Sequence, residues 1–128
     1  MPYSRDIPFG LLGRFFGLRV REPALEPGEE IRWEARANRF QQKIRSIGGR
    51  LYLTDRRLIF APNKFETRIG GKAWTARLLD LEQAFSDGSI RTVRVVTKGG
   101  EGQRFVVGQK TETAATIDAA TRAARAET

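Results

Sequence analysis

GGRLYLTDRRLIFAPN, residues 48–63, contains two short apolar runs that a polar turn separates. Leu51 and Leu53 alternate with Arg50, Tyr52 and Thr54, which is the period-two pattern of a strand with one face on a core and the other toward water. Residues 58–60 begin a second short strand of Leu, Ile and Phe. The stretch therefore predicts a β-hairpin.

Polar residues set the turn and the end of this hairpin. Asp55 and Arg56 interrupt the apolar run, and an aspartate side chain can bond its own backbone and so stabilise a tight turn. Pro62 and Asn63 end the second run, because proline cannot donate to a strand ladder and asparagine tolerates turn geometry.

The whole pattern resembles the central motif of GRAM domains, members of the pleckstrin-homology (PH) superfamily. The shared features are a glycine, Leu-Tyr-Leu-Thr, an acidic turn residue, Arg-Arg-Leu-Ile-Phe and a final Pro-Asn. Residues 25–31 (LEPGEEI) are similar to the family's approach to its first strand, and residues 78–85 (LLDLEQAF) to the segment after its fourth. The later strands would come from residues 93–107, so the resemblance runs from Leu25 to the C-terminus.

The resemblance implies a mainly β (α+β) fold, a PH-like barrel of about seven bent antiparallel strands capped by a C-terminal helix. It also implies binding rather than catalysis, so we do not expect an enzyme. The chain departs from the family in one respect: the capping helix usually carries a large aromatic residue, and residues 111–126 contain none. We expect one PH-like domain at residues 25–128, preceded by an apolar N-terminal extension at residues 1–24.

Hydrophobic periodicity predicts the remaining elements. Residues 29–37 and 72–78 alternate as strands, with Ile31 on the same face as Trp33, and residues 90–97 and 103–107 form a late hairpin around a glycine-rich connection. Thr111 is the expected N-cap of the C-terminal helix, whose inward residues are small. The expected core consists of Trp33, Leu51, Leu53, Leu58, Phe60, Trp74, Leu78, Phe105 and Ile117.

Composition excludes several kinds of chemistry. The 128 residues include no cysteine and no histidine, which removes disulfides, thiolate or imidazole metal sites, and Ser-His or Cys-His catalysis. The carboxylates Asp80, Glu82 and Asp87 cluster in sequence without a base or nucleophile beside them. We therefore expect no catalytic residues, no cofactor and no metal.

The positive charge is unevenly distributed. The net charge is +8, and residues 32–72 carry eleven basic and three acidic side chains, which also gives +8. In PH-like folds the loops between strands one and two and between strands three and four lie at the open end of the barrel. By this resemblance the candidate anionic-lipid-binding residues are Arg39, Lys43, Arg45, Lys64, Arg68 and Lys72. Each such residue near an anionic lipid surface contributes about 1 kcal/mol. The alternative is solvated or protein-facing charge.

The N-terminal segment is rich in Phe and Leu and would be amphipathic as a helix. Its candidate membrane or partner contacts are Phe9, Leu12, Phe15 and Phe16. Interfacial membrane helices have this composition. Packing on the chain's own sheet, or on a second copy in a homo-oligomer, is the other interpretation.

These observations leave three classes of partner. An anionic phospholipid surface ranks first, a protein partner or self-association second, and nonspecific nucleic acid a remote third, since no nucleic-acid-binding motif is present. No apolar run approaches the ~20 residues of a membrane-spanning helix, and no signal peptide is recognisable. We expect a cytoplasmic protein that binds peripherally at the inner face of the membrane.

Overall fold

The computed structural model describes residues 20, 22–41, 45–86 and 91–127. Within these residues, seven strands form one antiparallel sheet in the order β4-β3-β2-β1-β7-β6-β5. The strands are β1 (Ile31–Gln41), β2 (Arg45–Thr54), β3 (Arg57–Pro62), β4 (Trp74–Arg77), β5 (Leu81–Ser86), β6 (Thr92–Thr97) and β7 (Gly102–Val107). The helices are α2 (Lys64–Arg68), the single 3₁₀ turn η1 (Leu78–Asp80) and α3 (Lys110–Ala126).

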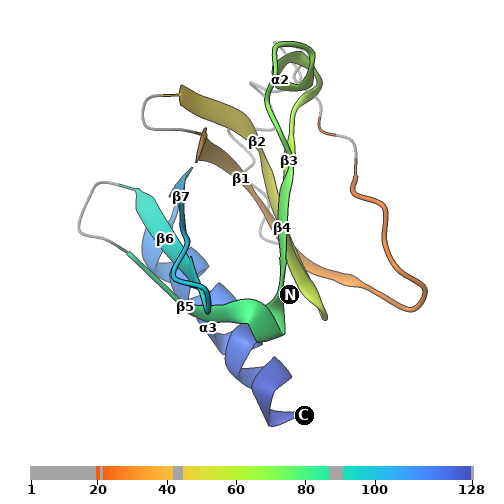
Figure 1. Ribbon diagram of the computed structural model, residues 1–128, viewed down its shortest axis with the longest axis vertical. Helices are drawn as coiled ribbons and strands as arrows, with labels where there is room; N and C mark the ends of the chain where they lie inside the picture. Colours follow the sequence, from red (N-terminus) through yellow and green to blue (C-terminus); the bar gives the residue numbers. More distant parts are fainter. Residues whose placement is uncertain (1–19, 21, 42–44, 87–90, 128) are drawn as a thin grey trace.

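The sheet is strongly bent, and α3 packs against β5, β6 and β7 (Figure 1). The edge strands β4 and β5 are not hydrogen bonded to each other, so the barrel stays open between them. The predicted bent antiparallel sheet of seven strands with a C-terminal helix is therefore confirmed.

The central hairpin forms as predicted. Leu51 lies opposite Phe60 and Leu53 opposite Leu58, and all four side chains are buried in the core. The turn, however, is not held by its aspartate. The Thr54 hydroxyl accepts the backbone N–H groups of Arg56 and Arg57 at 2.9 and 2.8 Å.

Asp55 instead joins the turn to the residue before β1. Its carboxylate accepts the Glu30 N–H at 3.0 Å, and its own N–H donates to the Glu30 carbonyl at 3.2 Å. The prediction that Asp55 stabilises its own turn was therefore wrong, because the neighbouring threonine hydroxyl occupies that position.

The outer face of the hairpin is also covered. Tyr52, expected toward water, is 2% exposed and packs with Ile59 and Ala61. Val20 and Ile31 lie against this cluster. A β-bulge in β1 between Ile31 and Trp33 turns Ile31 away from the face that it was predicted to share with Trp33. Burial raises the pKa of the Tyr52 hydroxyl to about 12.

The predicted core residues are buried, apart from Trp74, which is partly exposed and packs against the others. The Trp74 and Phe105 ring centroids are 5.8 Å apart, and those of Phe60 and Phe105 are 5.9 Å apart. Val93 and Val95 of β6 complete the inner surface. A core of tilted aromatic rings and branched aliphatic side chains thus fills the bend of the sheet.

Helix α3 begins two residues earlier than predicted. Its N-cap is Gln109, whose side chain makes no capping hydrogen bond, so the prediction of Thr111 as N-cap was wrong. Ile117 and Thr121 are buried against the sheet as expected, and the Thr121 hydroxyl donates to the Ile117 carbonyl at 3.0 Å. Near the C-terminus, the Arg125 guanidinium donates to the carbonyl of Leu81 at 2.6 Å, which fastens the helix to β5.

A buried ion pair fixes the segment before β1. Pro27 and Gly28, with φ of +80° at the glycine, form a turn closed by a 3.0 Å bond from the Glu29 N–H to the Glu26 carbonyl. This turn directs Glu29 inward, where its side chain is inaccessible to solvent. Arg57 donates to both carboxylate oxygens of Glu29, at 2.8 and 2.6 Å.

The Glu26 N–H also donates to Glu29 Oε1, at 2.9 Å, and the other oxygen accepts a bond from the Thr54 hydroxyl. This hydroxyl donates to Glu29 Oε2 at 2.6 Å, so Glu29 is bound to the same hydroxyl that holds the β2–β3 turn. The bonds from Arg57, aided by the bond from Thr54, lower the pKa of Glu29 to about 2. One carboxylate therefore ties the approach to β1 to the central hairpin.

Glu29→Gln should remove most of the acid sensitivity of the fold. The folded-state pKa of Glu29 lies below the unfolded value, so its stabilisation is complete above pH 4.5 and is lost as the pH falls toward 2. We expect the variant to lose about 3 kcal/mol of unfolding free energy at pH 7 and to approach wild type toward pH 2. Urea denaturation at pH 7, 5 and 3 measures this. Glu30→Gln, at an exposed neighbour, is the control, and a Glu29→Gln deficit that stays constant with pH would contradict the assignment.

Gly49→Ala should unfold the domain. A Cβ at Gly49 would lie 2.1 Å from the Ala61 carbonyl oxygen and 2.8 Å from the Pro62 Cα, both backbone atoms that cannot yield without separating β2 from β3. We expect a loss of more than about 3 kcal/mol in unfolding free energy, measured by thermal or urea denaturation. Gly99→Ala is the control, since the added methyl would approach nothing closer than 3.9 Å. Equal stability of the two variants would show that β2 and β3 are not packed this closely.

Candidate functional site

The connection between β3 and β4 folds into the short helix α2, which the sequence analysis did not predict. Asn63 is its N-cap: the side chain accepts the Glu66 N–H at 2.8 Å, and the Asn63 carbonyl accepts the Thr67 hydroxyl at 3.0 Å. Glu66 in turn accepts the Gly48 N–H at 3.0 Å, and its carbonyl accepts the Gly71 N–H at 2.6 Å. The helix is therefore fixed to the start of β2.

Two large apolar side chains are exposed on this segment. Phe65 of α2 is 58% exposed, and Ile69, the residue that ends the helix, is 50% exposed. Lys64, Arg68 and Lys72 flank them and are also exposed. No ion pair or hydrogen bond joins the Lys64 or Arg68 side chain to another described residue.

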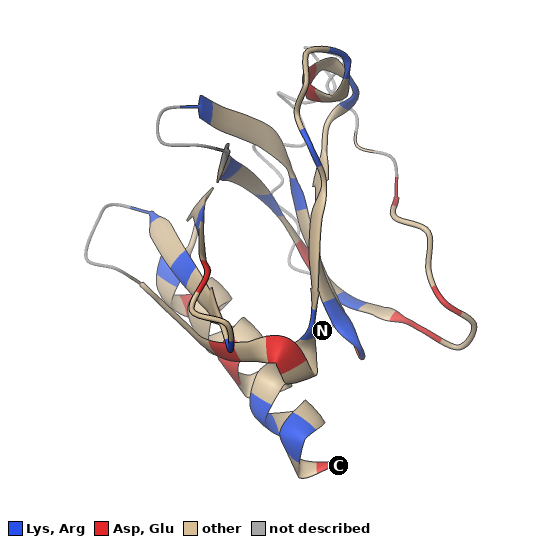
Figure 2. Ribbon diagram, viewed as in Figure 1, with Lys and Arg blue, Asp and Glu red and all other residues tan. Residues whose placement is uncertain are grey.

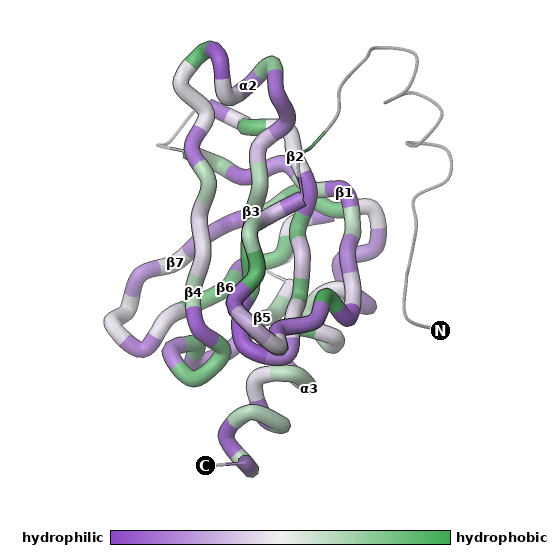
Figure 3. The backbone as a smooth tube through the Cα atoms, turned by 90° about the vertical axis from the view of Figure 1, so that its right-hand side faces the viewer, coloured by the Kyte–Doolittle hydropathy of each residue, from purple (hydrophilic) through white to green (hydrophobic). Residues whose placement is uncertain are grey.

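The segment forms one end of the molecule. Figure 2 shows basic residues on and around α2, and Figure 3 shows hydrophobic and hydrophilic residues alternating along the same segment. We call Lys64, Phe65, Arg68, Ile69 and Lys72 the α2 tip. An exposed apolar pair surrounded by cations is suited to an anionic surface with an apolar interior.

The remaining predicted basic residues have other positions. Arg39 was predicted in a loop but lies within β1, which extends four residues beyond its predicted end at Ala37 to Gln41 because it continues to pair with β2. The Arg39 side chain donates to the Gln103 side chain at 3.0 Å and to the Lys72 carbonyl at 3.2 Å. Burial lowers the pKa of its guanidinium. Arg39 thus bridges β1, β7 and the approach to β4.

Arg45 also belongs to a strand rather than to a loop. It is the first residue of β2, and its guanidinium lies 3.4 Å from the Glu66 carboxylate. Lys43 lies outside the described residues, as do the N-terminal candidates Phe9, Leu12, Phe15 and Phe16. Their proposed contacts stay predictions. Of the predicted lipid-binding set, Lys64 and Arg68 belong to α2 and Lys72 follows it, and Arg45 and Arg39 contact the same segment through Glu66 and the Lys72 carbonyl.

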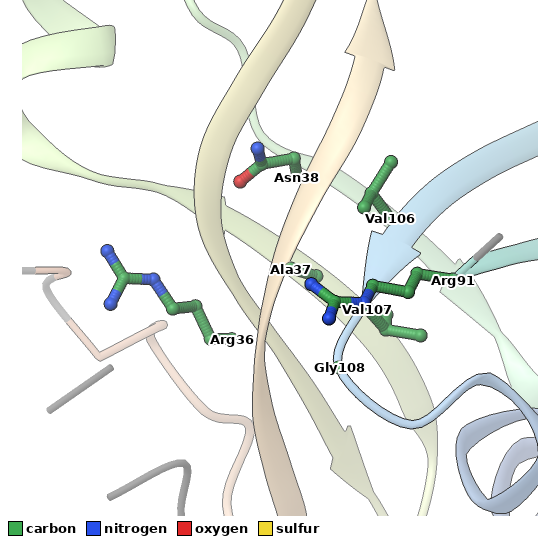
Figure 4. Close-up of a pocket in the computed structure, with 7 residues that line it drawn as sticks. All are labelled: Arg36, Ala37, Asn38, Arg91, Val106, Val107 and Gly108. Atoms are coloured by element: carbon green, nitrogen blue, oxygen red, sulfur yellow. The ribbon is translucent and has the colours of Figure 1, made fainter. Parts of the chain in front are cut away.

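A hollow lies where β1 and β7 diverge. Its cavity of about 200 Å³ is lined by Arg36, Ala37, Asn38, Arg91, Val106, Val107 and Gly108 (Figure 4). Arg91 has a φ of +60°, and its carbonyl accepts the Val107 N–H at 2.7 Å. Figure 4 shows the Arg91 side chain reaching toward Ala37 and Val107, while Arg36 points to the other side of β1.

The described part of the chain contains no group of carboxylates arranged to hold a metal ion. Asp80 and Glu82 are exposed, and Glu82 lies 3.3 Å from Arg125, while Asp87 is outside the described residues. Across the same described ranges, no helix is both long and apolar enough to cross a membrane.

Comparisons with known proteins identify the fold. No protein-family model matches the chain, and no curated protein matches it. Among solved structures, the N-terminal PH domain of Vps36 is similar, with a TM-score of 0.58 and 20% identity over 83% of this chain and 86% of that domain. The chain has a PH-like fold.

Two further solved structures are similar to this chain. The C-terminal domain of an unknown protein from Leishmania infantum gives a TM-score of 0.63 with 11% identity, over 89% of this chain and 97% of that one. A linker-DH/PH fragment of p115-RhoGEF gives 0.62 with 13% identity, over 88% of this chain and 34% of that larger fragment. At these identities the likeness is one of fold alone.

The sequence analysis missed Phe65 and Ile69. Their signal is present, because Lys-Phe-Glu-Thr-Arg-Ile follows an asparagine and places two apolar residues four apart among polar ones. The resemblance implied a loop between β3 and β4, so the sequence analysis predicted no helix there. The segment becomes recognisable only when Asn63 is taken as the N-cap of a short helix.

Arg39→Ala should destabilise the fold without weakening a surface interaction. The variant loses hydrogen bonds to Gln103 and to the Lys72 carbonyl, and we expect about 1–3 kcal/mol less unfolding free energy. Urea denaturation measures the stability. Lys64→Ala, at an exposed residue without a described partner, should leave it within about 0.5 kcal/mol of wild type. An Arg39→Ala protein as stable as wild type would return Arg39 to the candidate binding residues.

Proposed function

We propose that this chain is a non-catalytic PH-like module of the GRAM type that attaches peripherally to an anionic membrane surface through the α2 tip. The observation that carries the proposal is that exposed Phe65 and Ile69 lie among flanking cations on a capped segment that is hydrogen bonded to β2. The GRAM assignment rests on the motif in residues 48–63. The absence of histidine and cysteine from the sequence supports a role without nucleophilic catalysis.

The α2 tip combines two contributions to membrane affinity. Lys64, Arg68 and Lys72 together contribute about 3 kcal/mol near an anionic surface, at about 1 kcal/mol each. Transfer of the exposed parts of Phe65 and Ile69 from water into the lipid interface contributes roughly 2 kcal/mol more. The first contribution weakens with salt, whereas the second does not. The proposal therefore requires both anionic lipid and the apolar pair.

The charge contribution is tested by Lys64→Gln/Arg68→Gln. Co-sedimentation with phosphatidylcholine vesicles, with and without phosphatidylserine, should show about thirtyfold weaker binding to the anionic vesicles at low salt. Arg91→Gln/Arg94→Gln is the matched control, because it neutralises two exposed arginines and leaves the same net charge of +6, from +8 minus two. The control should bind within about twofold of wild type. Equal losses in the two proteins would mean that net charge, rather than the α2 tip, attracts the membrane.

The apolar contribution is tested by Phe65→Ser/Ile69→Ser at physiological salt. We expect vesicle binding to fall about tenfold or more, while the unfolding free energy stays unchanged because both side chains are exposed. Leu25→Ser/Leu79→Ser is the control, since these residues are 41% and 40% exposed elsewhere on the surface. Wild-type binding by the Phe65→Ser/Ile69→Ser protein would exclude insertion of the α2 tip.

A further inference from the structure

Strand β3 is buried on both of its faces. Leu58 and Phe60 lie in the core, and Ile59 and Ala61, which alternate with them, are only 5% and 8% exposed on the opposite face. Tyr52 stands directly across from Ile59 on β2 and is buried on that face too. We call Tyr52, Ile59 and Ala61 the outer hairpin cluster. Antiparallel sheets commonly leave one face to water, so the burial of this face requires a cover.

The long helix does not supply that cover. α3 packs against β5, β6 and β7, in the other half of the sheet (Figure 1). On one side the cluster borders the exposed Thr75 of β4, which lies opposite Ile59. On the other side Glu34 of β1 lies opposite Tyr52 and 3.3 Å from Arg50. The cluster is therefore an apolar strip with a polar rim.

Two described apolar residues pack against the cluster, Val20 and Ile31. Ile31 reaches it from the start of β1, beside the β-bulge. Val20 belongs to no strand or helix, and residues 8–19 (PFGLLGRFFGLR) lead directly to it. Residues 8–19 themselves lie outside the described residues. The point where the Phe-rich and Leu-rich segment ends is thus a point on the outer hairpin cluster.

Residues 8–19 suit this strip in composition and in length. Six of the twelve are Phe or Leu and none is acidic, so the segment has a large apolar area to remove from water. Twelve residues span about 18 Å as a helix and about 40 Å when extended, whereas a strand of six residues such as β3 is about 20 Å long. The segment is therefore long enough to cover the strip in either conformation.

We propose that residues 8–19 pack on the outer hairpin cluster of the same chain and continue the contact that Val20 begins. The segment is then part of the fold rather than a separate extension. Its Phe and Leu side chains are occupied within the chain, so they are not free to enter a membrane or to bind a second copy.

A single introduced thiol measures whether the face is covered, because the chain contains no cysteine. Ala61→Cys places the thiol in the outer hairpin cluster, and its rate of reaction with N-ethylmaleimide reports access from solvent. Ala73→Cys is the exposed reference, and Val95→Cys, on the core face of β6, is the buried reference. With the rest of the chain unchanged, Ala61→Cys should react at least about tenfold more slowly than Ala73→Cys.

Replacing the segment's apolar contacts should uncover the thiol. Phe9, Leu12, Phe15 and Phe16 are changed together to Ser in the full Ala61→Cys chain. We expect N-ethylmaleimide to react at least about tenfold faster than with the parent Ala61→Cys chain. The Val95→Cys thiol with the same four substitutions should stay protected, which separates loss of the cover from loss of the fold.

The matched control removes exposed apolar side chains elsewhere. Phe65→Ser/Ile69→Ser should leave the Ala61→Cys rate within about twofold of its parent, because both side chains are exposed on the α2 tip. Protection of Ala61→Cys should also persist through about a hundredfold dilution, since a contact within one chain does not depend on concentration.

Each of three results would contradict this assignment. The first is unchanged protection of Ala61→Cys after the four serine substitutions, which would mean that Val20 and Ile31 cover the cluster by themselves. The second is protection that disappears on dilution, which would assign the cover to the segment of a second copy. The third is equal reactivity of Ala61→Cys and Ala73→Cys with the segment intact, which would leave the segment available to a membrane or to another protein.

Discussion

The buried ion pair between Glu29 and Arg57 is the interaction on which the arrangement of the first three strands depends. A carboxylate removed from water is costly unless charged donors satisfy it, and Arg57 and Thr54 do so on both of its oxygens. Because Thr54 also holds the hairpin turn, the approach to β1, the end of β2 and the start of β3 meet at a single group. Their geometry is therefore coupled.

The same end of the sheet is reinforced by charge pairs closer to the surface. Glu26 accepts from Arg77 at 3.1 and 2.5 Å and lies 3.4 Å from Arg56, and the Leu78 N–H donates to the Arg56 carbonyl at 2.9 Å. These contacts bind the last residue of β4 to the same cluster. The other end of the hairpin carries α2, which can expose apolar and cationic side chains because its own backbone is capped and hydrogen bonded. One end of the sheet thus supplies rigidity, and the other supplies accessible surface.

Net charge alone gives a poor account of where a basic domain binds. Much of the excess in residues 32–72 is used within the fold: Arg45 lies beside Glu66, Arg50 beside Glu34 and Arg57 beside Glu29. Lys64 and Arg68 have no described partner, and neither does Arg94 in the second half of the sheet. Charges that lack a described internal partner therefore indicate a binding surface better than the net charge does.

The sequence by itself determined the central hairpin and most of the core. Alternation of Leu51 and Leu53 with their neighbours, and the Pro-Asn pair at which β3 ends, are local patterns that survive folding because strand periodicity is a property of the backbone. The motif resemblance supplied the number of strands and the capping helix. Tertiary structure alone decided which charged residues reach the surface, since Arg39 continues β1 and turns into the end of the barrel.

Tertiary structure also decided which surface the proposed function uses. Phe65 and Ile69 both lie exposed beside Lys64 and Arg68 because Asn63 caps the short helix that Ile69 ends. Such facts depend on contacts between residues far apart in the chain or on the competition between helix and loop. Local pattern fixes which residues form strands, but partner strands and caps fix which side chains remain available to a ligand.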